Sequence, residues 1–215
     1  MTTIRMLDLF CGAGGASMGY HQAGFEMVGV DLSAQPHYPF TFIRANALKL
    51  DDVFLGSFDA VHASPPCQCY SSASLPQRSQ GKRYVDLVAQ TRILLQRICK
   101  PWIIENVQGA PLNNPLMLCG TMFDLPLYRH RYFESSCGLT APTHKIHTVK
   151  QAKMGRAPKP GEYMNPVGHF SGVGAAQKAM EIAWMGQKEL AQAIPPPYTR
   201  FIGSQLLRSL QSNNL

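Results

Sequence analysis

A cysteine mounted between prolines is the residue of this chain best suited to nucleophilic chemistry. The run Ala63-Ser64-Pro65-Pro66-Cys67-Gln68 follows an apolar stretch that predicts a strand. Two consecutive prolines fix the backbone, and a thiolate nucleophile needs such fixed geometry for its attack. Cys69 suggests a metal pair with Cys67, but the sequence has no matching C-x-x-C partner. We therefore interpret Cys67 as a candidate nucleophile.

A carboxylate follows directly on a second apolar run, in Ile103-Ile104-Glu105-Asn106-Val107. Burial at the end of a strand raises the pKa of a carboxyl group, and a protonated Glu105 can donate a proton. A helix-capping or salt-bridged glutamate would give the same local pattern. The position predicts an acid at the same sheet edge as the cysteine.

Two arginines alternate with aromatic residues in Tyr128-Arg129-His130-Arg131-Tyr132-Phe133. On a strand, residues two apart share a face, so Arg129 and Arg131 can together clamp an anion or an acceptor-rich base edge. A solvated strand face is the alternative explanation for such a pair.

A glycine-rich turn follows the first apolar run, in Asp8-Leu9-Phe10-Cys11-Gly12-Ala13-Gly14-Gly15. Its glycines let the backbone approach a ligand, and the next helix offers free N–H groups. Asp31 ends the following apolar run, where nucleotide-binding folds place a carboxylate for ribose hydroxyls. Position 17 is Ser17 rather than the third glycine of a dinucleotide fingerprint, and no phosphate-cradling NTPase loop is present. The pattern favours adenosine without a pyrophosphate; an ordinary tight turn is the alternative.

These candidate groups follow apolar runs that alternate with helical stretches. We expect strands at residues 4–10, 25–30, 41–43, 58–62 and 102–104, and helices at 16–23, 84–100 and 199–210. This alternation predicts an α/β fold with a parallel, doubly wound sheet. Ligands of such sheets bind at the carboxyl ends of the strands, where the candidate groups lie.

Composition and charge restrict the class of protein further. The chain has 215 residues, 45% hydrophobic and 15% charged, which is typical of a globular domain and excludes wholesale disorder. Lys and Arg number 20 against 13 Asp and Glu, a formal net charge of +7 that predicts attraction to a polyanion. No apolar run is long enough for a bilayer, and the N-terminus lacks a signal pattern. We therefore expect no membrane association and a cytoplasmic location in which the cysteines stay reduced.

In chain order, these segments resemble the motifs of the DNA cytosine-5 methyltransferase family. DLFCGAGG is similar to the family's opening motif, SPPCQ to its nucleophile loop, ENV to its acid motif and Arg129-His130-Arg131 to its R-x-R strand. Residues 189–196 resemble its closing motif, with a helix after it that packs back on the cofactor lobe. The short chain, with Ala183-Trp184-Met185 ahead of that motif, is similar to compact phage-encoded members.

The resemblance implies a Rossmann-like class I methyltransferase sheet that binds S-adenosylmethionine and methylates C5 of a flipped-out cytosine. It implies that Cys67 attacks C6 of the base, that Glu105 protonates N3 and that Arg131, with Arg129, holds O2. The implied cofactor site consists of Phe10, Cys11, Gly12, Ala13, Gly14, Gly15, Asp31, Leu32, Asn46, Ala47, Pro65, Gln192 and Ala193.

Four positions depart from the family pattern. Asp31 stands where the family usually has Glu, which shortens the reach to ribose, and Asn46 stands where Asp is common. Ala191-Gln192 replaces a usual Gly-Asn pair in the closing motif, which affects contacts to the methionine end of the donor.

We expect three regions: a cofactor-binding and catalytic lobe at 1–133, a reduced target-recognition region at 134–180, and the closing motif with a C-terminal helix at 181–215. The middle region is rich in lysine, which favours phosphate contacts without specifying bases. Cys137, His144 and His147, with His130, were considered as a zinc set, but their spacing matches no standard zinc pattern, so no metal is expected.

The expected partner is double-stranded DNA, bound by a monomer that serves restriction protection or phage self-modification. An RNA cytosine methyltransferase and a non-catalytic DNA-binding module with the same fold remain alternatives. A sulfonium donor that transfers another alkyl group is a third.

Overall fold

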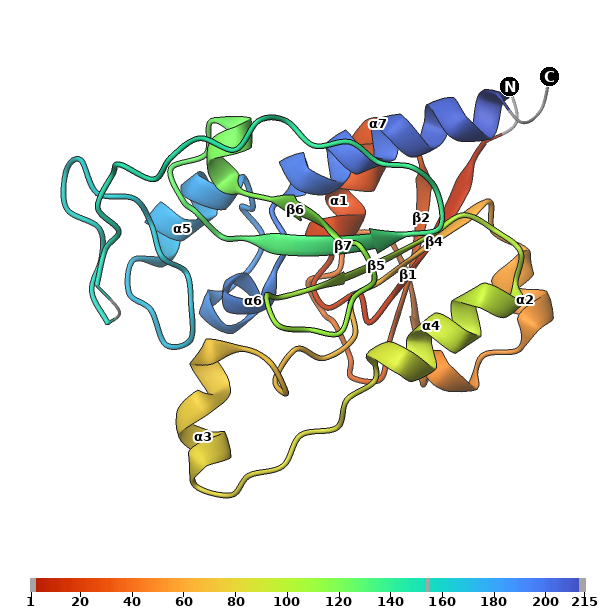
Figure 1. Ribbon diagram of the computed structural model, residues 1–215, viewed down its shortest axis with the longest axis horizontal. Helices are drawn as coiled ribbons and strands as arrows, with labels where there is room; N and C mark the ends of the chain where they lie inside the picture. The colour runs from red at the N-terminus through yellow and green to blue at the C-terminus, as the bar shows by residue number, and fades with distance from the viewer. Residues whose placement is uncertain (1–2, 154, 213–215) are drawn as a thin grey trace.

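A seven-stranded sheet forms the centre of the computed structural model, which describes residues 3–153 and 155–212 (Figure 1). The strands are β1 (Arg5–Leu9), β2 (Glu26–Asp31), β3 (Thr41–Arg44), β4 (Ala60–Ala63), β5 (Trp102–Asn106), β6 (Leu116–Leu118) and β7 (Arg131–Ser135). Their spatial order is β3-β2-β1-β4-β5-β7-β6.

The first five strands run parallel, whereas β7 is antiparallel to both β5 and β6. The order reverses between β1 and β4, and ligands of open α/β sheets bind at such a reversal. This arrangement confirms the predicted α/β, doubly wound, Rossmann-like class I methyltransferase fold. The antiparallel β6–β7 pair is an addition to the predicted parallel sheet.

Helices cover both faces of the sheet. They are α1 (Gly15–Ala23), α2 (Asp52–Gly56), α3 (Leu75–Ser79), α4 (Val88–Arg97), α5 (Val173–Met180), α6 (Gln187–Gln192) and α7 (Pro196–Ser212), with short 3₁₀ turns η1 (Ala47–Lys49), η2 (Ser72–Ser74) and η3 (Gly120–Phe123). Figure 1 shows α1 and α7 together on one side of the sheet and α2 and α4 on the other.

The core is divided by the sheet into two hydrophobic clusters. In β1, Met6 packs into the cluster under α1, α5, α6 and α7, while Leu7 and Leu9 pack into the cluster under α2 and α4. Alternate side chains of a strand point to opposite faces, so an unbroken apolar run is required where both faces are covered. This explains why the apolar runs predicted the strands well.

Small residues allow α1 and α7 to pack against each other at close range. A Cβ placed at Gly19 would lie 2.1 Å from the carbonyl oxygen of Pro196 and from Oγ1 of Thr199, so a side chain there is excluded. The hydroxyl of Thr199 donates to the carbonyl of Ala16 at 2.8 Å. Residues from the two ends of the chain thus cover one face of the sheet together.

The segment between β7 and α5 contains only isolated bridges among its described residues. The expected loop-rich character of residues 134–180 is therefore confirmed as far as α5. The helix α5 itself was not predicted from the sequence. The long helix expected at 84–100 is shorter, since α4 covers only Val88–Arg97. At its start, the backbone N–H of Val88 donates to the side chain of Asp86 at 2.9 Å. Within the described part of the chain, no helix has the length and apolar character to cross a membrane.

Candidate functional site

A cleft of about 740 Å³ opens at the edge where the parallel strands end. Among its lining residues are three of the four expected catalytic residues, Cys67, Glu105 and Arg131. The expected cofactor residues that line it are Phe10, Cys11, Gly12, Ala13, Gly15, Asp31, Leu32, Asn46, Ala47, Pro65, Gln192 and Ala193. One cavity therefore brings together nearly all the residues that the sequence singled out.

The loop that carries Cys67 is held from both sides. The side-chain amide of Asn106, at the end of β5, donates to the carbonyl of Pro65 at 2.9 Å inside the core. On the other side, the carbonyl of Gln68 accepts bonds from Ser74 Oγ at 2.6 Å and from Arg78 Nη1 at 2.7 Å. The cysteine is thereby fixed relative to the glutamate that precedes Asn106.

Glu105 is buried at the end of β5 and forms an ion pair with Arg131, at 3.0 Å from Nε to Oε1. Burial raises the pKa of the Glu105 carboxyl above its ordinary value, while Arg131 and a hydrogen bond from Ser64 oppose that rise. The effect of burial is the larger one, so the pKa of Glu105 is raised overall and its carboxyl group holds a proton more readily than an exposed one.

The Cys67 thiol is partly buried in the same cleft. Burial and the nearby Glu105 raise the pKa of this thiol, whereas Arg131 and Arg129 lower it. A thiolate is the reactive form of cysteine, so Arg131 and Arg129 act in favour of the nucleophile, while the pKa of the thiol as a whole is raised by burial.

A hydrogen-bonded chain leads from Glu105 into the core. Ser64 bonds the carboxyl group, Ser64 Oγ lies 2.8 Å from His62 Nε2, and His62 Nδ1 lies 3.0 Å from Tyr20 Oη. Burial lowers the pKa of His62 to about 3, so the ring is neutral. The sequence analysis missed this chain, because no pattern in the sequence links the members contributed by β4, β5 and α1.

Arg129 does not share the cleft with Arg131, contrary to the expected pair. Its buried guanidinium donates to the carbonyls of Pro166, Ala191 and Ala193 at 2.8 to 2.9 Å. Arg129 precedes β7, so the rule that strand residues two apart share a face does not apply. It ties the closing motif to the strand that carries Arg131.

The glycine turn after β1 is held by the carboxylate expected to contact ribose. The backbone N–H of Gly12 donates to Asp31 Oδ2 at 3.1 Å, and that of Ser33 donates to Oδ1 at 2.9 Å. Phe10 adopts a left-handed φ of 58°, an unfavourable conformation for a bulky residue that is common near binding sites.

Gly14 is the one expected cofactor residue that does not line the cleft. Its φ is 83°, and a Cβ there would lie 2.8 Å from Pro39 and 2.9 Å from Tyr38. The residue is required for the turn and for packing rather than for direct contact with a ligand in the cleft.

The remaining cofactor candidates come from two separate segments. Asn46 caps η1, since its side-chain oxygen accepts from Leu48 N at 3.0 Å, and Ala47 follows it in the cleft wall. Gln192 and Ala193 lie at the end of α6. Trp184 Nε1 donates to the carbonyl of Ala13 at 2.8 Å, which ties the residues ahead of the closing motif to the glycine turn.

Asp8 is a functional candidate that the sequence analysis did not identify. It is fully buried at the floor of the cleft, and Ser17 donates to its Oδ2, while its Oδ1 has no hydrogen-bond partner among the described residues. Burial raises the pKa of Asp8 to about 7, the Ser17 hydrogen bond opposes the rise, and Asp31 and Glu105 add to it. Since unpaired buried polar atoms are rare, this oxygen is a group that a polar ligand in the cleft could hydrogen-bond.

The four histidine and cysteine residues considered for zinc are only partly brought together. His130, His144 and His147 meet, but the sulfur beside them belongs to Cys119, whereas Cys137 contacts Ser135 Oγ at 3.3 Å. The structure thus substitutes a cysteine of the β6–η3 connection for the one expected from the sequence.

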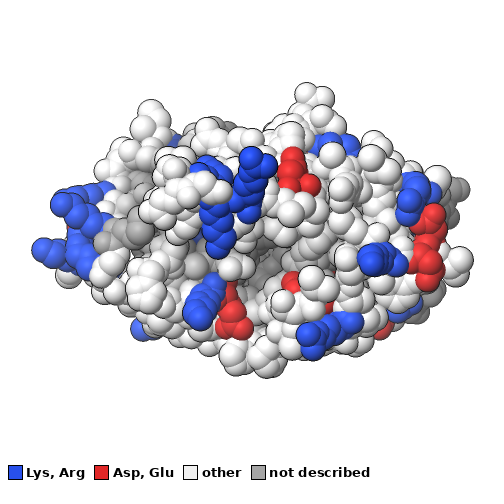
Figure 2. Space-filling model, turned by 90° about the horizontal axis from the view of Figure 1, so that it is seen from below, with Lys and Arg blue, Asp and Glu red and all other residues white. Residues whose placement is uncertain are grey.

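Basic side chains surround the cleft side of the molecule. Figure 2 views the edge at the bottom of Figure 1 and shows lysine and arginine side chains on both sides of a hollow, with fewer acidic ones between them. This face therefore offers basic groups that can attract a polyanion, in keeping with the formal net charge of +7.

Comparison with known proteins assigns the chain to a family. The family model of the C-5 cytosine-specific DNA methylase matches residues 4–115. The chain belongs to this family. The match includes the glycine turn, the Cys67 loop and Glu105, while β7 and the closing motif lie beyond it.

Two curated methylase relatives come from Herpetosiphon aurantiacus. The Type II methyltransferase M.HgiGI is 32% identical over 124 residues, which cover 51% of this chain and 95% of that protein. The Type II methyltransferase M.HgiDI is 30% identical over 123 residues, 51% of this chain but only 39% of that protein. The shared segment is thus nearly all of M.HgiGI but less than half of M.HgiDI.

Solved structures confirm the methyltransferase fold over nearly the whole chain. A chain described as a DNA modification methyltransferase encoded within an E. coli prophage superimposes with a TM-score of 0.71 at 13% identity, covering 98% of this chain and 100% of that one. The S. pombe Dnmt2 methyltransferase gives a TM-score of 0.65 at 13% identity, covering 97% and 99%.

Proposed function

We propose that this methylase-family chain transfers a methyl group from S-adenosylmethionine to C5 of a cytosine in double-stranded DNA, through a covalent bond between Cys67 and the base. The single observation that supports this most is the common cleft of Cys67, Glu105 and Arg131, with the expected donor residues in its wall. Nucleophile, acid and donor site thus face one volume.

The residues of the cleft fit the donor. Its volume of about 740 Å³ lies within the range for cofactor sites, and Asp31 stands at the end of β2 for the ribose hydroxyls. The unpaired Oδ1 of Asp8 provides a buried acceptor for a polar or cationic group. When bound, S-adenosylmethionine supplies an electrophilic methyl group.

The chemical problem is that C5 of cytosine is a poor nucleophile. Attack of the Cys67 thiolate on C6 forms a carbon–sulfur bond and makes C5 enamine-like, so that C5 can take the methyl group. Loss of the C5 proton and elimination of Cys67 then restore the aromatic ring and the free enzyme.

Negative charge builds on the ring as the thiolate adds. A protonated Glu105 donates to N3 and accepts from the exocyclic amine, which offsets this charge, and its raised pKa supports that role. Arg131 lies on the same side of the cleft, bonded to Glu105, and is positioned to hold the O2 atom.

The reaction requires access to both faces of the base. In a duplex, stacking covers C6 and pairing with guanine occupies N3, so the target base must be flipped out before Cys67 and Glu105 can reach it. The basic side chains around the hollow in Figure 2 are suited to the phosphates on either side of the extruded nucleotide.

The test is product identification. The protein is incubated with duplex DNA or with tRNA and labelled S-adenosylmethionine, the nucleic acid is digested to nucleosides, and the products are identified by mass spectrometry. We expect 5-methylcytosine from DNA with the wild type and none with Cys67→Ser, while Cys69→Ser, a change in the neighbouring cysteine, retains activity.

Other outcomes would each overturn one element of the proposal. Equal product from Cys67→Ser would refute the covalent mechanism, product from tRNA alone would refute the DNA substrate, and a different alkyl group on C5 would refute the donor. Failure to bind S-adenosylmethionine in calorimetry would indicate a non-catalytic module.

A further inference from the structure

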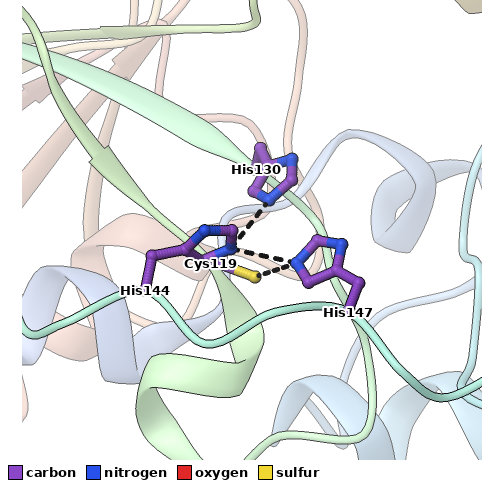
Figure 3. Close-up of side chains that lie close together, drawn as sticks. All are labelled: Cys119, His130, His144 and His147. Carbon is purple, nitrogen blue, oxygen red and sulfur yellow. Dashed lines mark hydrogen bonds between the residues drawn. The ribbon is translucent and has the colours of Figure 1, made fainter.

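We propose that Cys119, His130, His144 and His147 form a structural zinc site that fastens the irregular segment after β7 to the catalytic sheet. Figure 3 shows the thiol and the three imidazoles pointing toward one point, from the β6–η3 connection, the residue before β7 and the following loop. All four ligand atoms lie within 4.8 Å of one another.

Three of the six separations between ligand atoms are close to the edges of a zinc coordination tetrahedron, and all six lie within 4.8 Å, so that small side-chain shifts would complete it. Nε2 of His144 lies 3.0 Å from Nε2 of His147 and 3.4 Å from Nε2 of His130, and Cys119 Sγ lies 3.3 Å from Nε2 of His147. Tetrahedral zinc with ordinary bond lengths places two nitrogens about 3.3 Å apart, and a nitrogen and a sulfur about 3.6 Å apart.

Hydrogen bonding among the rings does not account for the arrangement. In a neutral imidazole each nitrogen carries either one proton or one lone pair, and both point in the ring plane. Nε2 of His144 therefore serves only one of its two close nitrogen neighbours.

The cluster is supported by its surroundings. The Tyr128 ring stacks on His147 at 3.6 Å between centroids and 10° between planes. The Tyr128 hydroxyl donates to the carbonyl of Val149 at 2.7 Å and accepts from its N–H at 2.8 Å. This tyrosine fixes the loop beside the point where the rings converge, as expected for residues that orient metal ligands.

One thiolate and three imidazoles are the ligand chemistry of zinc. Mixed sulfur and nitrogen donors in tetrahedral geometry select Zn²⁺ over Mg²⁺ or Ca²⁺, and four protein ligands make a closed, structural site. The Cys119 thiol donates to the Tyr128 carbonyl at 3.2 Å without metal. On binding, this proton passes to solvent, sulfur bonds zinc as the thiolate, and Thr121 Oγ1, 3.2 Å away, can donate to the sulfur.

The metal site lies next to Arg131, one of the residues of the catalytic cleft. His130 lies between Arg129, which binds the closing motif, and Arg131, which pairs with Glu105. A metal bound there joins the start of β7 to a loop that has few regular backbone hydrogen bonds of its own. Zinc therefore stabilises the strand position on which Arg131 depends.

Metal content tests the proposal directly, independently of donor binding or methyl transfer. The full chain is produced with zinc supplementation and its zinc measured by plasma mass spectrometry, beside His144→Ala and His147→Ala. The controls are Cys137→Ser and His169→Ala, which remove a cysteine and an exposed histidine outside the cluster. We expect about one zinc per chain in the wild type and both controls.

The ligand variants should bind zinc at least about 100-fold more weakly, since loss of even a supporting residue costs 10–100-fold in metal affinity. A chelator should lower the Tm of the wild type by about 5–10 °C and leave that of His144→Ala almost unchanged. Circular dichroism verifies that His144→Ala, a change on the surface loop, remains folded.

Replacing zinc with cobalt tests the coordination geometry of the site. Reconstitution with Co²⁺ should give the strong visible absorption of a tetrahedral site and a thiolate-to-cobalt band that is lost in Cys119→Ser but retained in Cys137→Ser. A wild-type chain with far less than one zinc, or variants that hold zinc as well as the controls, would overturn the proposal.

Discussion

The carboxyl edge of the sheet and the segment between β7 and α5 are held in place by different means. At the sheet edge, Glu105 lies near the end of β5 and Cys67 lies in the loop after β4, so each is fixed within a few residues of a hydrogen-bonded strand. Between β7 and α5 only isolated bridges occur among the described residues, and side-chain contacts hold the segment, such as those of its own Arg156 and of Tyr128, which bonds Val149 from outside it.

The difference shows where precision comes from in a small α/β protein. The backbone at a strand end is held by the hydrogen bonds between neighbouring strands, so a reacting group placed there needs few additional bonds. An irregular segment has no ladder, and its conformation depends on individual side chains or on a metal. Changes at the sheet edge should therefore affect chemistry before stability, and changes in the segment the reverse.

Replacing the buried acid should give the largest effect. Glu105→Gln keeps the size and burial of the side chain but removes the proton donated to the base, so methyl transfer should fall by about 10²–10⁴-fold. Single-turnover methylation measures the loss, with the exposed Glu26→Gln as the matched control. A Glu105→Gln enzyme with near-normal turnover would show that the edge residue is structural.

The buried Asp8 should make stability depend on pH. Its pKa is 3.8 in the ordinary state and about 7 when folded, so the folded chain retains a proton that the unfolded chain releases between these values. The free energy of unfolding should therefore fall as pH rises through this window, by on the order of a few kcal/mol.

Asp8→Asn removes this titration and should flatten the dependence. Urea unfolding at about pH 4 and about pH 8 measures the slope. The control is Asp124→Asn, at an exposed position whose left-handed backbone suits asparagine. An unchanged slope in Asp8→Asn would mean that another group holds the extra proton.

Asn106 connects the acid strand to the nucleophile loop. Asn106→Ala leaves the Pro65 carbonyl buried without its donor, which should cost about 1–3 kcal/mol in unfolding free energy. The Cys67 loop loses a fixed point at the same time, so kcat should fall about tenfold or more. Exposed Gln108→Ala, two residues further along, should change neither quantity; equal losses in both variants would contradict the assignment.

The smallest effect is expected where Tyr128, just before β7, holds the irregular segment at Val149. Tyr128→Phe removes the two hydrogen bonds to Val149 and should lower the unfolding free energy by about 1 kcal/mol with little change in kcat. Tyr163→Phe, in the neighbouring ring, is the control. If Tyr128→Phe reduced kcat more than stability, the distinction between the two regions would not hold.

The sequence predicted the features that depend on local pattern. Buried parallel strands require continuous apolar runs, so β1, β2, β4 and β5 were found, and with them the edge where Cys67 and Glu105 stand. The helix α5 was missed because it is short and its ends are formed by left-handed Gly172 and Glu181 rather than by recognisable capping side chains.

Features that depend on contacts between distant segments were not predictable. The unpaired oxygen of Asp8 arises only when α1 and β1 are packed, and the chain from Ser64 through His62 joins residues of different elements. The choice of Cys119 over Cys137 depends on the path of a loop without regular structure. The divergence of Arg129 from Arg131 depends on where β7 begins.

The packing of α7 on α1 also has a consequence for synthesis on the ribosome. Gly19 and Ala16 contact Pro196 and Thr199, so the surface beside the first glycine turn is covered by residues that are translated much later, Thr199 lying 183 positions after Ala16. The nascent catalytic half leaves the ribosome with an apolar face open to water. Its final folding step therefore follows the emergence of α7, and chaperone demand should be greatest just before that helix appears.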